Sequence, residues 1–137
     1  MSDTQSVPKV ACPYCKTSNA LEIVQFSHNG ILRWYESLNC KNCNTCIEAD
    51  GHGIPPEEIR TNLIQLYGSW YIGLNYVMSV SNTAKVIHHT LSLELNEAVK
   101  IVKNSPDNLY IGTKGETVWL ADLLINAGEY PITGKID

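Results

Sequence analysis

The chain has 137 residues, of which 44% are hydrophobic and 18% are charged, a composition typical of folded rather than disordered proteins. Its formal net charge is −4 and neither half gathers Lys and Arg into a cluster, so nucleic acid is a disfavoured partner. No apolar run approaches the roughly 20 residues that cross a membrane. The start of the sequence lacks the pattern of a secretory signal, so we expect a cytoplasmic protein with reduced thiols and a flexible tail at residues 1–8.

The cysteines fall into two groups, CPYC at residues 12–15 and CKNCNTC at residues 40–46. Two C-x-x-C pairs separated by a few tens of residues have the spacing of a structural tetrahedral zinc site. Such a site takes four thiolates, so one of the five cysteines must be left out. Because a site closed by four sulfurs has no position for water or substrate, catalysis by these thiols is not expected.

The residues after the cysteines indicate which four bind zinc. After the second cysteine of such a turn, or knuckle, the chain usually adopts a left-handed conformation, which Gly favours and Asn tolerates. Cys43 is followed by Asn44, whereas Cys46 is followed by the β-branched Ile47. The predicted zinc ligands are therefore Cys12, Cys15, Cys40 and Cys43. Cys46 would then begin a strand, and the alternative is a site that uses Cys43 with Cys46.

The segment between the two cysteine groups predicts a β-hairpin. Residues 21–26 and 31–37 are rich in aliphatic and aromatic residues, and Asn29-Gly30 between them is the preferred pair for a type I′ turn. A segment this small cannot bury enough apolar surface to be stable alone, so we expect a bound metal to stabilise its fold. Residues 9–53 resemble a zinc ribbon in three features: the CPYC motif, the paired strands, and CKNC followed by CIEADG.

The second strand of this hairpin carries a candidate partner surface made by Arg33, Trp34 and Tyr35. Together with Phe26 these residues could also stack on nucleic-acid bases, although cross-strand packing is the commoner use of such aromatic residues. Residues 54–68 then predict a connector helix, with Pro56 in its first turn and Gly68 as its stop.

Residues 69–137 predict a second domain. Its expected elements are a strand in SWYIGLNYV, helices in NTAKVIHHTL and NEAVKIVKNSP, a strand in NLYIG, a helix in TKGETVWLADLLINAG and a strand in YPITGKI. Thr113 and Glu116 have the spacing of a capping box, and Gly128 is placed to end that helix. The order is β-α-α-β-α-β, a sandwich of helices on one sheet face, so the whole chain is expected to be α+β.

LELNEAVKIVKNSP and GTKGETVWLADLLINAGEYPI are similar to the C-terminal domain of the bacterial ribosomal stalk protein of the large subunit, over residues 70–136. The resemblance implies a surface on the first two helices of the domain that recruits translational GTPases. The residues of that surface here include Lys85, His88 and Lys100, while Ser92 and Glu94 replace the glycines of the turn between the helices.

Together these features favour a non-enzymatic zinc-binding protein that recognises another protein. Its partner could be a basic nuclease, if the chain is an immunity or antitoxin-type inhibitor, or a translation factor, if it is an adaptor. The first alternative is a nucleic-acid-binding ribbon that also uses Lys16 and Lys41. The second alternative is an enzyme that uses His52 or His88. The sequence argues against it, because it has no Ser, His and Asp in the order of a catalytic triad, no phosphate-binding loop and no paired-carboxylate motif.

Overall fold

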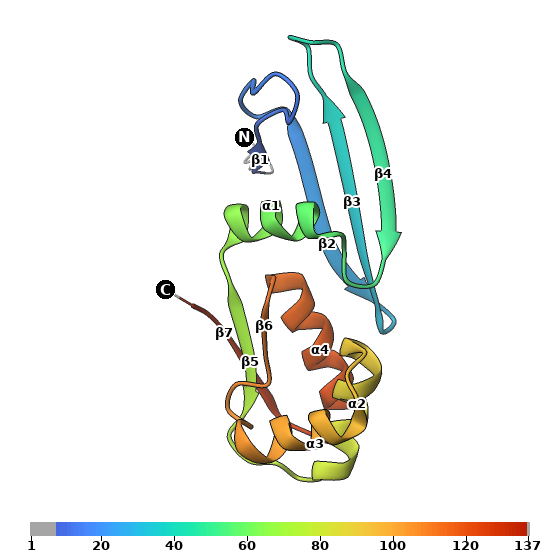
Figure 1. Ribbon diagram of the computed structural model, residues 1–137, viewed down its shortest axis with the longest axis vertical. Coiled ribbons are helices and arrows are strands. Elements are labelled where there is room, and N and C mark those ends of the chain that lie inside the picture. Colours follow the sequence, from blue (N-terminus) through green and yellow to red (C-terminus); the bar gives the residue numbers. More distant parts are fainter. Residues whose placement is uncertain (1–7, 137) are drawn as a thin grey trace, which may run out of the picture. The chain divides into compact units, whose positions relative to one another are not determined.

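The computed structural model describes residues 8–136, which form a mixed α+β fold with two antiparallel sheets and four helices (Figure 1). All but the last residue of the expected tail, residues 1–8, lies outside this range. The chain divides into two compact units, one that ends at Tyr67 and one that begins at Gly68. Within residues 8–136, no helix combines the length and the apolar character needed to cross a membrane.

The first unit is a four-stranded sheet with one helix. Its elements are β1 (Lys9–Val10), β2 (Leu21–His28), β3 (Ile31–Asn39), β4 (Cys46–His52) and α1 (Glu57–Tyr67), and the strands lie side by side in chain order. Asn29 and Gly30 connect β2 to β3 with φ angles of 52° and 77°. Both angles are positive, as a type I′ turn requires, so the predicted hairpin turn is confirmed.

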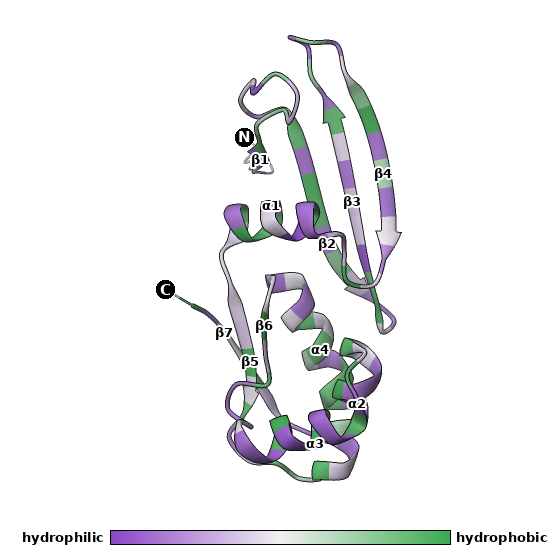
Figure 2. Cartoon of the chain, viewed as in Figure 1, coloured by the Kyte–Doolittle hydropathy of each residue, from purple (hydrophilic) through white to green (hydrophobic). Residues whose placement is uncertain are grey.

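One face of this sheet packs against α1. The register pairs Leu21 with Leu38 and Ile23 with Glu36, so these residues share a face, and α1 contacts β1 and β2. Ile59 and Leu63 of α1 are buried. The buried cluster of the unit consists of Val10, Cys12, Leu21, Ile23, Leu38, Cys40, Ile59 and Leu63. Figure 2 shows the alternation of hydrophobic and hydrophilic residues along these strands, and the helix predicted as a connector contributes to the core of the first unit.

The second unit is a three-stranded sheet with three helices. Its elements are β5 (Trp70–Leu74), α2 (Val80–Leu91), α3 (Leu95–Asn104), β6 (Tyr110–Gly112), α4 (Lys114–Asn126) and β7 (Pro131–Lys135). The strand order is β6-β5-β7, and both pairings are antiparallel. The buried core combines the sheet with all three helices and consists of Ile72, Leu74, Ala84, Ile87, Ala98, Val102, Leu109, Leu120 and Leu124.

A capping box fixes the start of α4, and a left-handed residue ends α2. Thr113 accepts a hydrogen bond from the Glu116 amide at 3.0 Å, and the Glu116 carboxylate accepts one from the Thr113 amide at 3.1 Å. This is the predicted capping box. Tyr110 also donates its hydroxyl to the Glu116 carboxylate, at 2.7 Å, so the cap connects α4 to β6. At the end of α2, Ser92 adopts φ 55°, a left-handed conformation in a place where glycine is easier.

A buried carboxylate connects the end of α4 to the start of α2. Glu129, which follows α4, is 1% exposed. It accepts hydrogen bonds from the amides of Met78 and Ser79 at 2.9 and 3.0 Å, and from the Thr83 hydroxyl at 2.7 Å. A buried charge is tolerated only when it is well hydrogen-bonded. These three hydrogen bonds therefore fix the start of α2 relative to the end of α4.

Candidate metal centre

The first knuckle follows β1. The Cys12 amide donates to the Thr17 carbonyl at 2.8 Å, and the Lys16 amide donates to the Cys12 carbonyl at 2.9 Å. Lys16, directly after Cys15, has φ 66°. The chain from Cys12 to Thr17 therefore closes into a tight turn that holds two cysteines, with a left-handed residue after the second one.

The second knuckle connects β3 to β4 and repeats this geometry. The Cys40 amide donates to the Thr45 carbonyl at 3.0 Å, and Asn44, directly after Cys43, has φ 58°. The left-handed conformation expected at Asn44 is thus confirmed. Hydrogen bonds from the amides of Cys43 and Asn42 to the Cys40 sulfur lower the pKa of the Cys40 thiol, and they outweigh the effect of its burial.

The two knuckles bring four sulfur atoms together. The sulfurs of Cys12, Cys15, Cys40 and Cys43 all lie within 4.8 Å of one another. The Cys15–Cys40 pair is separated by 3.5 Å and the Cys12–Cys43 pair by 3.8 Å. Sulfurs placed tetrahedrally at the usual zinc–sulfur distance of about 2.3 Å would be about 3.8 Å apart. The cluster therefore has the dimensions of a zinc site that uses four cysteines.

Each knuckle contains a threonine that the sequence analysis overlooked. Both knuckles read C-x-x-C-x-T, and Thr17 and Thr45 occupy the last position. The Thr17 hydroxyl lies 3.1 Å from the Cys15 sulfur, and the Thr45 hydroxyl lies 3.1 Å from the Cys43 sulfur. Groups that hydrogen-bond to metal ligands orient them and adjust their basicity. The signal was present in the sequence as the repetition of the motif, which extends beyond the cysteines.

The surroundings of the cluster lower the pKa of some of its thiols and raise the pKa of another. The Thr17 hydroxyl, the Asn42 amide group and the Thr17 backbone lower the pKa of the Cys15 thiol to about 5. The pKa of Cys43 is raised instead. The side chain and amide of Thr45 lower it, but loss of hydration and the neighbouring thiols of Cys15 and Cys40 raise it by more. A divalent cation at the centre would stabilise all four thiolates together. Its binding would therefore release the protons of those thiols that are still protonated.

Soft thiolate ligands in a tetrahedral arrangement suit zinc, whereas magnesium and calcium take oxygen ligands. Cys12 and Cys40 are buried, Cys15 is half-buried and Cys43 is exposed, so an ion held by the four sulfurs would be covered by protein on the side of Cys12 and Cys40 and would lie near the surface at Cys43. With four protein ligands no coordination position is left for a substrate. The arrangement can therefore hold two distant parts of the chain together but offers no open site for metal chemistry.

The remaining candidate ligands lie outside this cluster. Cys46 begins β4, where it pairs with Asn39, and its sulfur is 3.7 Å from the Asn39 side-chain oxygen. His52 is at the other end of β4. Six steps along a strand span about 20 Å, so His52 is remote from Cys46 and from the knuckle before it.

The ligand assignment predicts different outcomes for two neighbouring serine variants. Cys43→Ser removes a sulfur of the cluster and should lower the zinc content of the purified protein well below one equivalent. Cys46→Ser should keep one equivalent, because the Cys46 sulfur lies outside the cluster. Metal analysis of both proteins, purified without added zinc, measures this difference. Retention of zinc by Cys43→Ser together with its loss from Cys46→Ser would show that Cys46 is the fourth ligand.

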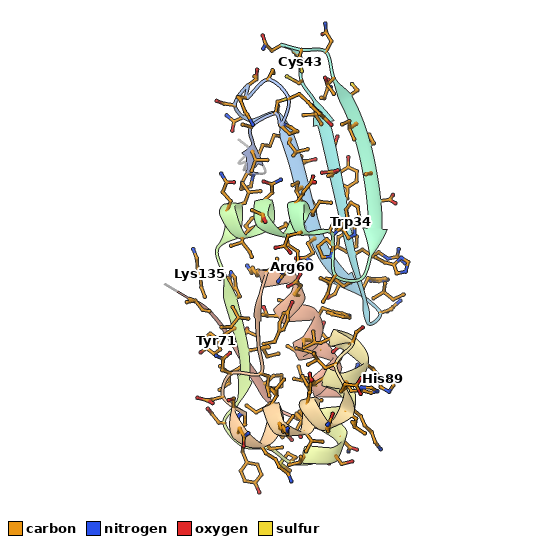
Figure 3. All side chains as sticks on the ribbon, in the orientation of Figure 1. Trp34, Cys43, Arg60, Tyr71, His89 and Lys135 are labelled. Carbon is orange, nitrogen blue, oxygen red and sulfur yellow. The ribbon has the colours of Figure 1, made fainter. Side chains whose placement is uncertain are left out.

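The structure separates the residues of the candidate partner surface on β3. The register pairs Arg33 with Phe26 and Tyr35 with Val24, so these four residues share the face opposite α1. Trp34 lies on the α1 side, where it packs against the core and its ring covers Gly51. Figure 3 shows Trp34 and Cys43 toward opposite ends of this sheet. Arg33, Trp34 and Tyr35 therefore do not form one continuous surface.

The candidate surface of the second unit lies on α2 and α3. Lys85 and Lys100 are exposed, and Lys100 borders a shallow, mainly apolar groove along α3. His88 is half-buried, and its Nδ1 donates to the carbonyl of Leu93 beyond the end of α2. The ring of His88 therefore ties α2 to the turn before α3, while the adjacent His89, labelled in Figure 3, is exposed.

Comparison of the chain with family models, with curated proteins and with solved structures gives no match. Its function must therefore be inferred from its own residues. The strongest chemical feature among residues 8–136 is the group of four cysteines.

Proposed function

We propose that the chain is a zinc-binding protein that recognises another protein and catalyses no reaction itself. The ion would connect the knuckle before β2 to the knuckle between β3 and β4, and so hold the ends of a long hairpin together. Its four protein ligands would make its role structural. Recognition would then depend on the surfaces that this framework presents.

One surface supports protein recognition in particular. We call the face of the first sheet that lies opposite α1 the open face. There Phe26 is 48% exposed and Ile31 is 42% exposed, next to Arg33 and Tyr35. Exposed apolar side chains grouped together mark binding surfaces, and aromatic residues and Arg are enriched at protein–protein interfaces.

The charges of the open face favour a protein over a nucleic acid. By register the open face carries two cations against three carboxylates: Lys9, Arg33, Glu22, Glu48 and Asp50. Phosphate backbones are bound by clustered cations, and this face has an excess of acids. The exposed side chains of Phe26 and Ile31 beside an excess of carboxylates are the observation on which the proposal depends.

The cations proposed for nucleic-acid binding are also dispersed. Lys16 and Lys41 lie in the two knuckles. Arg33 lies near the opposite end of β3, at a distance of about 20 Å along the strand from the knuckle that follows it. These cations therefore do not form the continuous track that a phosphate backbone requires.

The second unit extends the proposal to two biological settings. The resemblance of LELNEAVKIVKNSP and GTKGETVWLADLLINAGEYPI to the ribosomal stalk domain supports an adaptor of translation, although no family model matches the chain, and Lys85 and Lys100 would then flank its binding surface on α2 and α3. The acidic character of the chain supports an inhibitor that docks on a basic nuclease. The two settings differ in the partner, so identification of the partner distinguishes them.

The experiment uses the immobilised, zinc-loaded full-length chain and a nuclease-treated extract of the source cells. A captured protein is identified by mass spectrometry, purified and titrated against the free chain by calorimetry. We expect saturable binding at one site. Phe26→Ser should weaken it by about tenfold or more, because exposed aromatic side chains contribute strongly to interfaces.

The matched control is Tyr130→Ser, which removes an aromatic side chain that is 77% exposed in the second unit and should leave the affinity unchanged. Retention of single-stranded RNA or DNA at low salt, lost steeply as salt rises, with no protein retained, would contradict the proposal and favour a nucleic-acid-binding ribbon.

A further inference from the structure

β4 has an unpaired outer edge. It is a strand of seven residues at the end of the sheet order, and none of the residues 8–136 pairs with its outer side in a sheet. Along such an edge the N–H and C=O groups of every second residue point away from the sheet and can pair with an added strand.

The side chains of β4 alternate in a way that leaves room for a neighbour. Cys46, Glu48, Asp50 and His52 are exposed on the open face. Ile47, Ala49 and Gly51 on the α1 side are only half-buried, although Ile47 packs against the core. The apolar layer on this face of the sheet is therefore incompletely covered at the β4 edge, and apolar side chains of an added strand would extend it.

The charges of β4 select the kind of strand that fits. Glu48 and Asp50 lie two residues apart on the same face, and the register pairs them with the neutral side chains of Ser37 and Tyr35. Neither carboxylate forms an ion pair within residues 8–136. Because directly opposite unlike charges stabilise neighbouring strands, cations on an added strand would complement both acids.

The same charges disfavour a second copy of this chain. In antiparallel pairing of two β4 strands about Ala49, Glu48 of one copy would lie opposite Asp50 of the other. A shift of one strand by two residues in either direction, which keeps the open faces of the two copies on the same side, places Glu48 opposite Glu48 or Asp50 opposite Asp50. Acidic side chains on an edge strand are a known protection against such self-association.

We propose that the outer edge of β4 binds an extended segment of a partner protein by strand addition, and that this segment alternates Lys or Arg with apolar residues. The cations would face Glu48 and Asp50, and the apolar residues would lie beside Ile47 and Ala49. This inference rests on the proposed function, because it names the chemistry of the segment through which the partner binds.

The test uses a fluorescent synthetic peptide of about nine residues that alternates Lys and Val, long enough to span β4. Its anisotropy is measured with the zinc-loaded full-length chain. We expect saturable binding, no binding of the matching Glu–Val peptide, and a loss of at least about tenfold in affinity in the double variant Glu48→Lys with Asp50→Lys. The matched variant Glu97→Lys with Asp122→Lys reverses two exposed acids of the second unit and should bind as the wild type does.

Two N-methylated forms of the Lys–Val peptide test whether binding is by strand addition. One carries methyl groups on the amides of its odd residues and the other on those of its even residues. Only one set of amides faces β4 in an added strand, so the two affinities should differ by at least about tenfold. Equal affinities would mean charge attraction without strand pairing, and absence of binding would equally overturn the inference.

Two further measurements separate this inference from the proposed function. A dimer in sedimentation experiments that is lost in the Glu48→Lys, Asp50→Lys variant would make a second copy the occupant of the edge. An identified partner that binds this variant as tightly as the wild type would overturn the edge inference and leave the proposed function standing. Failure to capture any protein would count against the proposed function itself, whatever the peptide does.

Discussion

Removal of the metal by a chelator is expected to unfold the first unit and to leave the second unit folded. The buried cluster of the first unit includes Cys12 and Cys40, so the cluster of thiols is part of its core. Structural zinc contributes about 10–16 kcal/mol at pH 7 in small zinc-binding domains. This is as large as the entire stability of a typical domain, about 5–15 kcal/mol. Without the ion, the thiolates would also repel one another.

Amide signals in nuclear magnetic resonance spectra of the full-length chain distinguish the two units. Signals from β2 and β3 should collapse toward random-coil positions on chelation and return when one equivalent of zinc is added. Signals from the second unit, which has its own core around Ile72, Leu120 and Leu124, should not move. Cys46→Ser is the matched control and should behave as the wild type does. A chelated protein that keeps all its first-unit signals would show that the sheet and α1 suffice without a metal.

Local features were the part of the structure that the sequence predicted well. The Asn29-Gly30 turn, the left-handed Asn44 and the Thr113–Glu116 capping box each depend on a few neighbouring residues whose conformational preferences are strong. The same preferences separated Cys43 from Cys46, because only the residue after Cys43 adopts a positive φ. The cluster of four cysteines thus follows from spacing together with one dihedral preference.

The sequence also held a signal that separates Trp34 from its neighbours. Successive side chains of a strand point to opposite faces, so Trp34 cannot share a face with Arg33 and Tyr35. The alternation of apolar and polar residues is hard to recognise in the sequence of β3, because the acidic Glu36 occupies a position on the α1 side. Burial and the neighbouring carboxylate of Glu58 raise the pKa of Glu36, as expected of an acid in a position that apolar residues normally fill.

Tertiary contacts between distant residues could not be predicted from the sequence. An amphipathic helix such as α1 shows which of its faces is apolar but not which sheet it covers. Glu129 is the clearest example, because its three donors lie 46 to 51 residues away in the chain. Nothing in the local sequence Gly128-Glu129-Tyr130 distinguishes this buried carboxylate from an exposed one, and only the folded second unit reveals its partners.

Replacement of Glu129 should destabilise the second unit strongly. Glu129→Ala would leave the amides of Met78 and Ser79 and the hydroxyl of Thr83 without their acceptor. Loss of hydrogen bonds to a buried charge and the creation of unsatisfied donors should cost about 3 kcal/mol. Glu129→Gln keeps the shape and one acceptor and should cost about half as much. Urea unfolding, followed by the amide signals of the second unit at pH 7, measures both values.

The same carboxylate predicts how the stability of the second unit depends on pH. Burial alone would raise the pKa of Glu129, but the hydrogen bonds from Met78, Ser79 and Thr83 outweigh it and lower the pKa below its ordinary value of 4.5. A lowered pKa in the folded state means that the unfolded chain takes up a proton first as the pH falls. The contribution of Glu129 is therefore complete above about pH 4.5 and is lost as the pH falls through the folded-state pKa.

The wild type should accordingly lose stability below that pH, and Glu129→Gln should lose less, because it has no proton to gain. Asp122→Asn is the matched control, since it replaces an exposed carboxylate of α4 with an amide and should keep the acid dependence of the wild type. Equal acid sensitivity in the wild type and in Glu129→Gln would mean that Glu129 is not the carboxylate whose protonation loosens the start of α2.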